Sequence, residues 1–248
     1  MMLNQTMEKL YSMRLKGMVL GLEEQIKDPN VSELSFEERL GLLVDRQWFC
    51  REENRLKQRL KNAKLKHSAV IENIDYKVSR GLDKAAMQEL ASCRWIRAGR
   101  NLIITGPTGV GKTYLACALG EKACREDLGV LYKRTQRLVH ELAVARVDGS
   151  YLKLLAQISR FELLILDDWA LSPLGGQAQQ DILEVIDDRV DSRSTMVTSQ
   201  LPVDKWYDMM GDPSAADALL DRILGKSTKI NLKGASLRKE GKIEKGKE

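Results

Sequence analysis

The sequence has little of what marks a membrane, secreted or zinc-binding protein. No apolar run approaches the roughly 20 residues of a membrane-spanning helix, and residues 1–21 mix charged with apolar side chains, which argues against a secretory signal. The two histidines, His67 and His140, lie far apart, and the four cysteines form no C-x-x-C pair, so we expect no zinc site. Cysteines of this kind are usually reduced apolar thiols, and we expect a cytoplasmic protein.

What the chain does have is enough apolar sequence for a core and a modest excess of positive charge. Its 248 residues are 43% hydrophobic and 30% charged, which fits one large domain or a medium domain with a small one. The net charge is +5, so the distribution of the basic residues matters more than their total.

A glycine-rich stretch between an apolar run and a helical pattern is the most informative feature. Residues 102–104 predict a buried strand, residues 106–113 read G-x-x-x-x-G-K-T, and residues 114–124 predict a helix. This order is typical of a P-loop, whose glycines let backbone N–H groups turn toward a phosphate at a helix N-terminus. The alternative is a glycine-rich turn before an ordinary helix.

The P-loop interpretation assigns nucleotide contacts residue by residue. Lys112 would contact the β- and γ-phosphates of ATP, and the hydroxyl of Thr113 would bind Mg²⁺. The predicted nucleotide contacts are Gly106, Pro107, Thr108, Gly109, Val110, Gly111, Lys112, Thr113 and Tyr114.

Two carboxylates end a second apolar strand. Residues 163–166 run Leu-Leu-Ile-Leu into Asp167 and Asp168, as in a Walker B element, where a buried strand delivers an aspartate to the Mg²⁺ ion. We expect Asp167 to hold the ion and Asp168 to orient or deprotonate the attacking water. Taken alone, the pair would favour a helix cap after a core strand, but the P-loop upstream favours the Walker B interpretation.

Polar residues also end the next predicted strand, which covers residues 195–199. Thr198, Ser199 and Gln200 could sense the γ-phosphate or simply cap the end of the strand, and the residues favour neither interpretation. Arg222 lies on a predicted helix, where it could pair with Asp217 or Asp221. It could instead be an arginine finger that reaches a neighbouring subunit's nucleotide; from the residues alone the ion pair is favoured.

Strands alternate with helices from residue 101 onward, which predicts an α/β fold with a mostly parallel sheet. Thr135 is expected to cap a helix, and Asp83 another. The further expected helices cover residues 84–97, 135–145, 151–159, 176–192 and 215–224, with a short one around Trp206, and the further strands cover 130–132 and 228–232.

The residues before this region predict helices. A first helix is expected over residues 3–28, and Ser35 with Glu38 forms a capping-box pattern that begins a long helix reaching about residue 66. The expected apolar face of the long helix consists of Phe36, Leu40, Leu43, Trp48, Leu56, Leu60 and Ala63.

The second half of the long helix carries an excess of positive charge. Such a patch neutralises phosphates and predicts salt-dependent, sequence-tolerant DNA binding, although a solvated helix face is an equally good interpretation. The candidate DNA-binding residues are Arg51, Arg55, Lys57, Arg59, Lys61, Lys64 and Lys66.

No guanine-reading Asn-Lys-x-Asp and no Leu-Ser-Gly-Gly-Gln signature is present, which argues against a small GTPase and a transporter ATPase. The motifs that are present resemble those of the IstB-like insertion-sequence helper ATPases, AAA+ proteins similar to the helicase loader DnaC. The resemblance rests on Cys93–Ile96, Asn101–Thr113, Tyr114–Gly120, Leu164–Trp169 and Thr198–Pro202, and it covers nearly the whole chain.

The resemblance implies an Mg²⁺-dependent ATPase that assembles into oligomers on duplex DNA and helps a partner transposase choose and join its target. Lys112, Thr113, Asp167 and Asp168 match the Walker positions, Ser199 or Gln200 the γ-phosphate sensor, and Arg222 the arginine finger. Arg238 could be a second sensor. The implied organisation is a helical domain for DNA and assembly (residues 1–68) followed by an AAA+ domain (69–237), and the polar, charged composition of residues 238–248 predicts a disordered tail. A helicase loader and a non-hydrolysing ATP switch are the alternatives.

Overall fold

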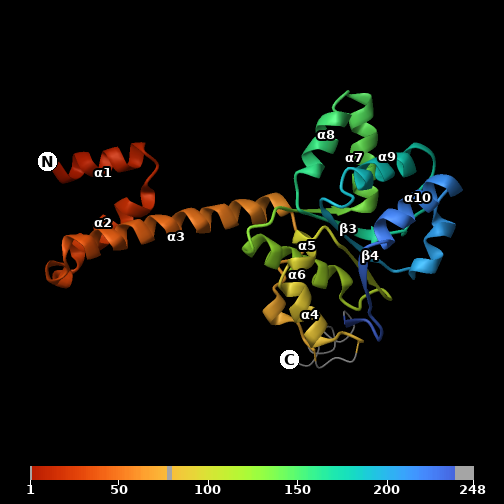
Figure 1. Ribbon diagram of the computed structural model, residues 1–248, viewed down its shortest axis with the longest axis horizontal. Helices are drawn as coiled ribbons and strands as arrows, with labels where there is room; N and C mark the ends of the chain where they lie inside the picture. The colour runs from red at the N-terminus through yellow and green to blue at the C-terminus, as the bar shows by residue number, and fades with distance from the viewer. Residues whose placement is uncertain (1, 77–79, 238–248) are drawn as a thin grey trace, which may run out of the picture. The chain divides into compact units, whose positions relative to one another are not determined.

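The computed structural model describes residues 2–76 and 80–237 of the chain (Figure 1). The chain divides into two compact units, Met1–Gln58 and Arg59–Glu248. The division falls inside helix α3 (Phe36–Ala63), ten residues before the expected boundary between residues 68 and 69. The reason is that the last turn of α3 belongs to the larger unit, where Arg59 donates to the Cys124 carbonyl at 2.9 Å and Ala63 is fully buried.

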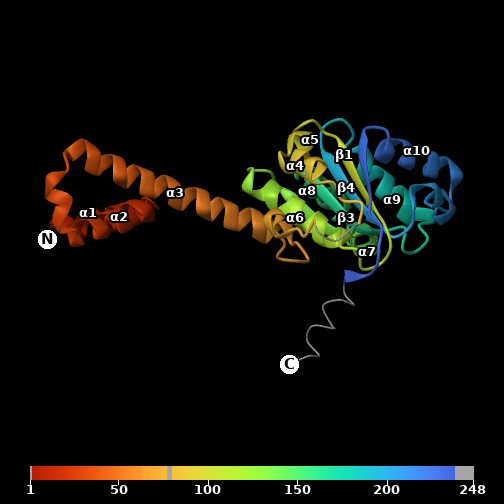
Figure 2. The same ribbon diagram turned by 90° about the horizontal axis from the view of Figure 1, so that it is seen from below.

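The first unit contains α1 (Met2–Ser12), α2 (Lys16–Lys27), a 3-10 turn (Pro29–Glu33) and most of α3. The single helix expected over residues 3–28 is wrong, because the chain turns between α1 and α2 with Arg14 at φ 59°. Two glycines let α2 approach α3 closely (Figure 2). A Cβ on Gly17 would lie 2.6 Å from the Cα of Gln47, and the Gln47 side chain accepts from the Gly17 N–H at 2.8 Å.

The start of α3 follows the sequence prediction, but its apolar face does not. The capping box is confirmed, since Glu38 accepts from the Ser35 N–H at 2.7 Å and Ser35 Oγ accepts from the Glu38 N–H at 3.3 Å. Leu43 is buried, whereas Phe36 is 74% and Trp48 61% exposed, as is much of Leu40. The prediction of one continuous apolar face is therefore wrong, because α2 covers only the part of α3 around Leu43 and Gln47.

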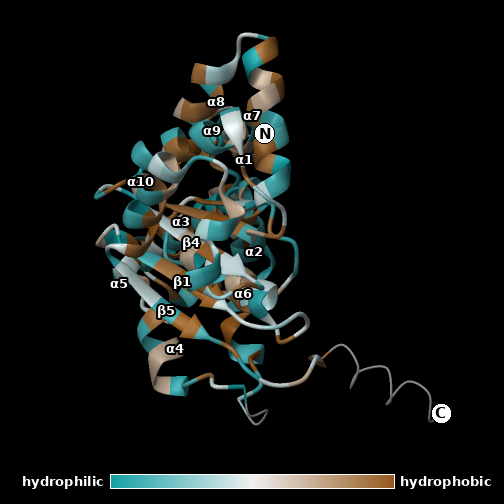
Figure 3. Ribbon diagram, turned by 90° about the vertical axis from the view of Figure 1, so that its right-hand side faces the viewer, coloured by the Kyte–Doolittle hydropathy of each residue, from teal (hydrophilic) through white to brown (hydrophobic). Residues whose placement is uncertain are grey.

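The second unit is built on a five-stranded sheet in which every strand pair is parallel, which confirms the predicted α/β architecture. The strands are β1 (Asn101–Thr105), β2 (Val130–Arg134), β3 (Leu163–Trp169), β4 (Ser194–Ser199) and β5 (Ser227–Asn231), in the spatial order β2-β3-β4-β1-β5. β1, β3 and β4 are nearly all buried because helices cover both faces. β1 and β3 each contain an apolar run, whereas β4 carries serine and threonine at both ends, and Figure 3 colours the strands by hydropathy. The carboxyl ends of β1, β3 and β4 lie at one edge of the sheet, next to one another.

Helices cover the two faces of this sheet separately (Figures 1 and 2). One face carries α4 (Lys84–Ala91), α5 (Arg94–Arg97) and α6 (Lys112–Arg125). The other carries α7 (Thr135–Val147), α8 (Tyr151–Ser159), α9 (Gly176–Asp187) and α10 (Pro213–Leu224), and a continuous hydrophobic core lies between these helices and the strands. No helix within the described ranges is long and apolar enough to cross a membrane.

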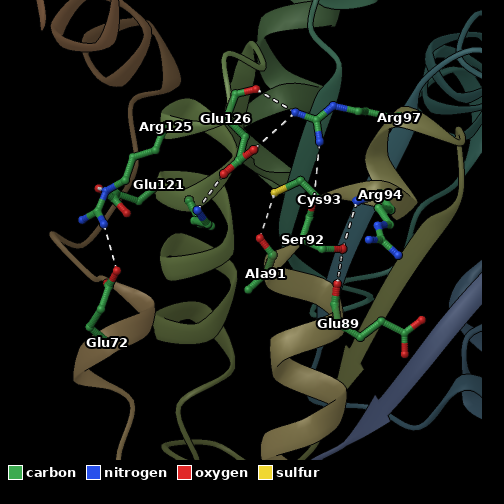
Figure 4. Close-up of polar contacts among 11 residues, drawn as sticks. Glu72, Glu89, Ala91, Ser92, Cys93, Arg94, Arg97, Glu121, Arg125 and Glu126 are labelled. Atoms are coloured by element: carbon green, nitrogen blue, oxygen red, sulfur yellow. Dashed lines mark hydrogen bonds and ion pairs between the residues drawn. The ribbon is translucent and has the colours of Figure 1, made fainter.

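The helix expected over residues 84–97 is in fact two helices. Asp83 caps α4 as predicted, but Cys93 takes φ 56° and separates α4 from α5 (Figure 4). Ion pairs fasten this region to α6, since Arg97 and Lys122 both contact Glu126, and Arg125 contacts Glu72 and Glu121. Ion pairs with residues outside α6, Arg97 and Glu72, thus fix the last turns of the helix that follows the P-loop.

Two smaller expectations are also corrected. Thr135 is the first residue of α7 rather than its cap, and its hydroxyl donates to the Asp167 carbonyl at 3.1 Å. The helix expected to reach residue 192 ends at Asp187, and turns follow over residues 188–192, with Asp191 at φ 59°. The expected disordered tail lies outside the described residues.

Candidate nucleotide-binding site

The loop between β1 and α6 has the backbone of a phosphate cradle. Gly106, Gly109 and Gly111 have φ of 148°, 87° and 97°, which other residues rarely adopt. The backbone of Leu232 also lies too close to Gly106 for a side chain, since a Cβ on Gly106 would lie 2.4 Å from the Leu232 carbonyl oxygen. Gly111 is the residue before α6, so the free N–H groups of the first helical turn face the loop.

Lys112 is folded into this loop. Its side chain donates to the Gly106 carbonyl at 2.7 Å and to the Pro107 carbonyl at 2.9 Å, and the residue is 7% exposed. The ammonium group is therefore held against the backbone that would surround a phosphate. A bound phosphate would replace the two carbonyl oxygens as its hydrogen-bond acceptor.

Asp167 stands at the centre of the site. Its carboxylate is fully buried and accepts hydrogen bonds from Thr113 at 2.9 Å, Tyr132 at 2.6 Å and Thr198 at 2.5 Å. These donors come from α6, β2 and β4, so the parallel sheet brings them together at the carboxyl ends of its strands. Burial, and then the bond to Asp167, raises the pKa of the Tyr132 hydroxyl, which remains a donor at neutral pH.

The residues of this site fit a magnesium–nucleotide complex. The hydroxyl of Thr113 and the carboxylate of Asp167 lie 2.9 Å apart, and both are oxygen donors of the kind that Mg²⁺ prefers. The glycine-lined cradle and Lys112 lie next to them and suit phosphate groups. Mg²⁺ bound here would neutralise phosphate charge, while the chain supplies the ligands, the N–H groups and the fixed geometry.

Asp168 differs from Asp167 in backbone conformation and in exposure to solvent. It takes φ 58°, in the left-handed region that Asp tolerates better than most residues, where β3 becomes irregular after Leu166. Its side chain is 27% exposed and lies 4.0 Å from the Arg134 guanidinium. Asp167 thus faces the protein and Asp168 the open side, which suits one for a metal ion and the other for water.

The side chains of Ser199 and Gln200, the two candidate γ-phosphate sensors, make different contacts. Ser199 is fully buried and bonded on both sides, because its hydroxyl donates to the Trp169 carbonyl at 2.9 Å and accepts from the Leu201 N–H. The Gln200 side chain accepts from Thr108 of the P-loop at 2.6 Å. Ser199 contacts the phosphate loop only through its backbone, whose carbonyl accepts from the Gly106 N–H at 3.2 Å, whereas Gln200 contacts it through its side chain.

Arg222 lies at the other end of the sheet. Its backbone carbonyl accepts from the Asn101 side chain at 3.1 Å, at the start of β1, whereas the P-loop follows the end of β1. Its guanidinium pairs with Asp187 of α9 and donates to the Ala218 carbonyl at 2.8 Å. The ion pair expected with Asp217 or Asp221 is therefore wrong, and Arg222 lies at the end of β1 opposite to its own chain's P-loop.

Sequence reasoning missed several residues around the cradle. Tyr132 bonds Asp167 from β2, and its place in the predicted strand next to β3 was the available signal. Thr198, which the sequence indicated only as part of a polar strand end, bonds Asp167 from β4. Arg80 received no role from the sequence, yet it is 5% exposed beside the P-loop, with Nη1 3.4 Å from the Val110 carbonyl. Its buried Nε has no hydrogen-bond partner among the residues that the structure describes.

The chain after β5 also reaches the cradle. The Leu232 N–H donates to the Thr105 carbonyl at 2.8 Å, and the Leu237 N–H donates to the Gly109 carbonyl at 3.1 Å. Residues 232–237 therefore run along the P-loop, a placement that nothing in their composition indicated. Arg238, the candidate second sensor, lies outside the described residues.

The seven basic residues predicted to bind DNA have different surroundings. Arg55 and Lys57 pair with Glu52 and Glu53 on the same helix, and Arg59 pairs with Asp127 at 2.5 Å. Lys66 lies 3.8 Å from the Asp167 carboxylate. The others, Arg51, Lys61 and Lys64, are exposed, with no ion pair to another residue of the described chain.

Comparisons with known proteins agree with this site. The family model described as IstB-like ATP binding protein matches residues 8–245. A protein of Sinorhizobium fredii named as the insertion sequence ATP-binding protein y4pL is 48% identical over 96% of this chain and 98% of its own length. The ATP-binding protein of insertion sequence IS21 from Pseudomonas aeruginosa is 31% identical over 96% of this chain and 89% of its own.

Solved structures share the fold of the larger unit. The AMPPCP-bound DnaA of Aquifex aeolicus superposes with a TM-score of 0.59 at 20% identity, covering 75% of this chain and 58% of that one. The DnaC helicase loader gives 0.53 at 19% identity, covering 70% of this chain and 98% of that one. The fold is that of an AAA+ P-loop ATPase, and the chain belongs to the family of IstB-like ATP binding proteins.

Proposed function

We propose that this protein is an Mg²⁺-dependent AAA+ ATPase that assembles on duplex DNA when ATP is bound and assists a partner transposase in target selection and transposition. The observation that carries the ATPase part is the contact between Thr113, which begins the P-loop helix, and the buried carboxylate of Asp167. The transposase part is supported by the insertion-sequence relatives of the chain. Such a protein would work in the cytoplasm, where ATP and DNA are both present.

Each residue has a definite task in this proposal. The P-loop N–H groups and Lys112 bind the β- and γ-phosphates, and Thr113 with Asp167 holds Mg²⁺. Asp168, on the open side, orients the attacking water and accepts its proton. Its shorter arm, compared with a glutamate, predicts slow turnover.

Two further groups would respond to the γ-phosphate. Gln200 is the sensor rather than Ser199, because it already contacts Thr108 of the phosphate loop. Arg222 acts in a neighbouring subunit, because its own P-loop lies at the opposite end of β1. ATP then lies at the junction of two copies, which makes assembly depend on the nucleotide.

The test measures ATP binding, turnover and assembly size with and without duplex DNA. We expect binding without DNA, and large assemblies only when ATP and duplex DNA are both present. Lys112→Ala should abolish binding, while Lys153→Ala, which removes a charge from an exposed position on α8, should change nothing. Assembly on duplex DNA without any turnover would favour a non-hydrolysing switch, and a preference for single strands would favour a helicase loader.

A further inference from the structure

Lys66 was expected to contact DNA, but it lies beside the buried carboxylate of the metal site. Its ammonium group is 3.8 Å from Asp167 Oδ2, and its side chain is 26% exposed. The hydrogen-bond donors around that carboxylate, Thr113, Tyr132 and Thr198, are neutral hydroxyls. Among residues 2–76 and 80–237, Lys66 is the one cation within 4.0 Å of this carboxylate.

A short strap, residues 63–69, fixes Lys66 in this place. Ala63 and Ala69 at its ends are fully buried, and a Cβ on Gly120 of α6 would lie 3.1 Å from Cδ2 of Leu65. The backbone of Lys66 and His67 lies beside the thiol of Cys117, which is also on α6. The strap thus packs on the helix that begins at the P-loop, and backbone contacts place the ammonium group.

The charges explain why a cation is needed here. A fully buried carboxylate that accepts only neutral hydrogen bonds is costly, and a nearby positive charge lowers that cost. Mg²⁺ at Asp167 would supply more charge than Lys66 and would repel the ammonium group at this distance. The metal ion and Lys66 therefore compete for the same carboxylate.

We propose that Lys66 is a positioning residue for the metal site, which neutralises and orients Asp167 until Mg²⁺ takes its place. This inference rests on the proposed Mg²⁺–ATP site. In this arrangement, loading of the metal drives the ammonium group of Lys66 away from Asp167. The charge on Lys66 then raises the Mg²⁺ concentration needed to fill the site.

The test follows binding of a fluorescent, slowly hydrolysed ATP analogue over a series of Mg²⁺ concentrations. In Lys66→Met the midpoint concentration of Mg²⁺ should fall by roughly tenfold, because the competing charge is gone. Lys66→Arg, which keeps the charge, should retain the wild-type midpoint. Lys153→Met, an equal loss of charge on exposed α8, should retain it too.

An unchanged midpoint in Lys66→Met would overturn the inference, and so would a higher midpoint, which would make Lys66 a phosphate ligand. Should Lys66→Met fail to fold, Lys66→Gln makes the same comparison with a neutral donor. Failure of the wild-type protein to bind the analogue at any Mg²⁺ concentration would instead refute the proposed function.

Discussion

Arg222 offers the sharpest test of whether the nucleotide lies between two copies of this chain. β1 is five residues long, so at roughly 3.3 Å per residue about 13 Å separate Asn101, which binds the Arg222 backbone, from Thr105 before the P-loop. Arg222 is therefore expected to be unable to reach its own nucleotide. Within its own chain its guanidinium pairs with Asp187, so a neighbour's phosphate has to replace that carboxylate.

The substitution Arg222→Ala should leave ATP binding intact and lower turnover by about 10³-fold or more, the contribution typical of an arginine finger. Lys112→Ala should also be inactive, but because it no longer binds ATP. In an equal mixture, each junction draws its P-loop from one copy and its arginine from the next. Half of the P-loops and half of the arginines are intact, so roughly a quarter of wild-type turnover should return on mixing.

The assay is phosphate release on duplex DNA by each variant alone and by the mixture. A mixture whose assemblies contain both variants and are no more active than the components would refute the action of Arg222 in a neighbouring subunit. Normal turnover by Arg222→Ala alone would remove the residue from catalysis altogether.

The remaining predictions concern catalysis, DNA and pH. Asp168→Asn should bind ATP normally and trap the assembled state, as measured by light scattering, and normal turnover would remove Asp168 from its role. Removing four exposed or partly paired basic side chains should lower the slope of log affinity for duplex DNA against log salt by up to about 3.6, and an unchanged slope would place the DNA site elsewhere. The four residues to change to Ala are Arg51, Arg55, Lys57 and Lys61. Burial raises the pKa of the Cys93 thiol from 9.0 to about 11, so the unfolded state holds fewer protons between these values and stability falls as pH rises through them. In urea unfolding, Cys93→Ala should lessen that fall by up to about 1.4 kcal/mol per pH unit, and an identical pH profile would contradict the shift.

The sequence predicted the core of the site because its parts are local. The P-loop and the strand that ends in Asp167 are each a few contiguous residues, and their apolar runs indicate buried strands directly. Parallel pairing then brings the carboxyl ends of β1, β3 and β4 together without further information. This is why Lys112, Thr113 and Asp167 could be placed from the sequence alone.

The rest depends on packing between distant segments. Lys66 looks like one more charge in a basic helix, and only the burial of Ala63 and Ala69 against the larger unit shows that it belongs with Asp167. The exposure of Phe36 and Trp48 has the same origin, since an apolar pattern does not say how much surface a partner helix covers. The break at Cys93 is a single left-handed residue that no propensity marks.

The central claim is that ATP bound in the cradle at residues 106–113 joins copies of this chain on duplex DNA. Sedimentation velocity with Mg²⁺–ATP and duplex DNA tests it most directly, with Lys112→Ala beside the wild-type protein. We predict a large DNA-bound assembly for the wild-type protein only when both ligands are present, and none for Lys112→Ala. A wild-type protein that stays monomeric with both ligands would contradict the account.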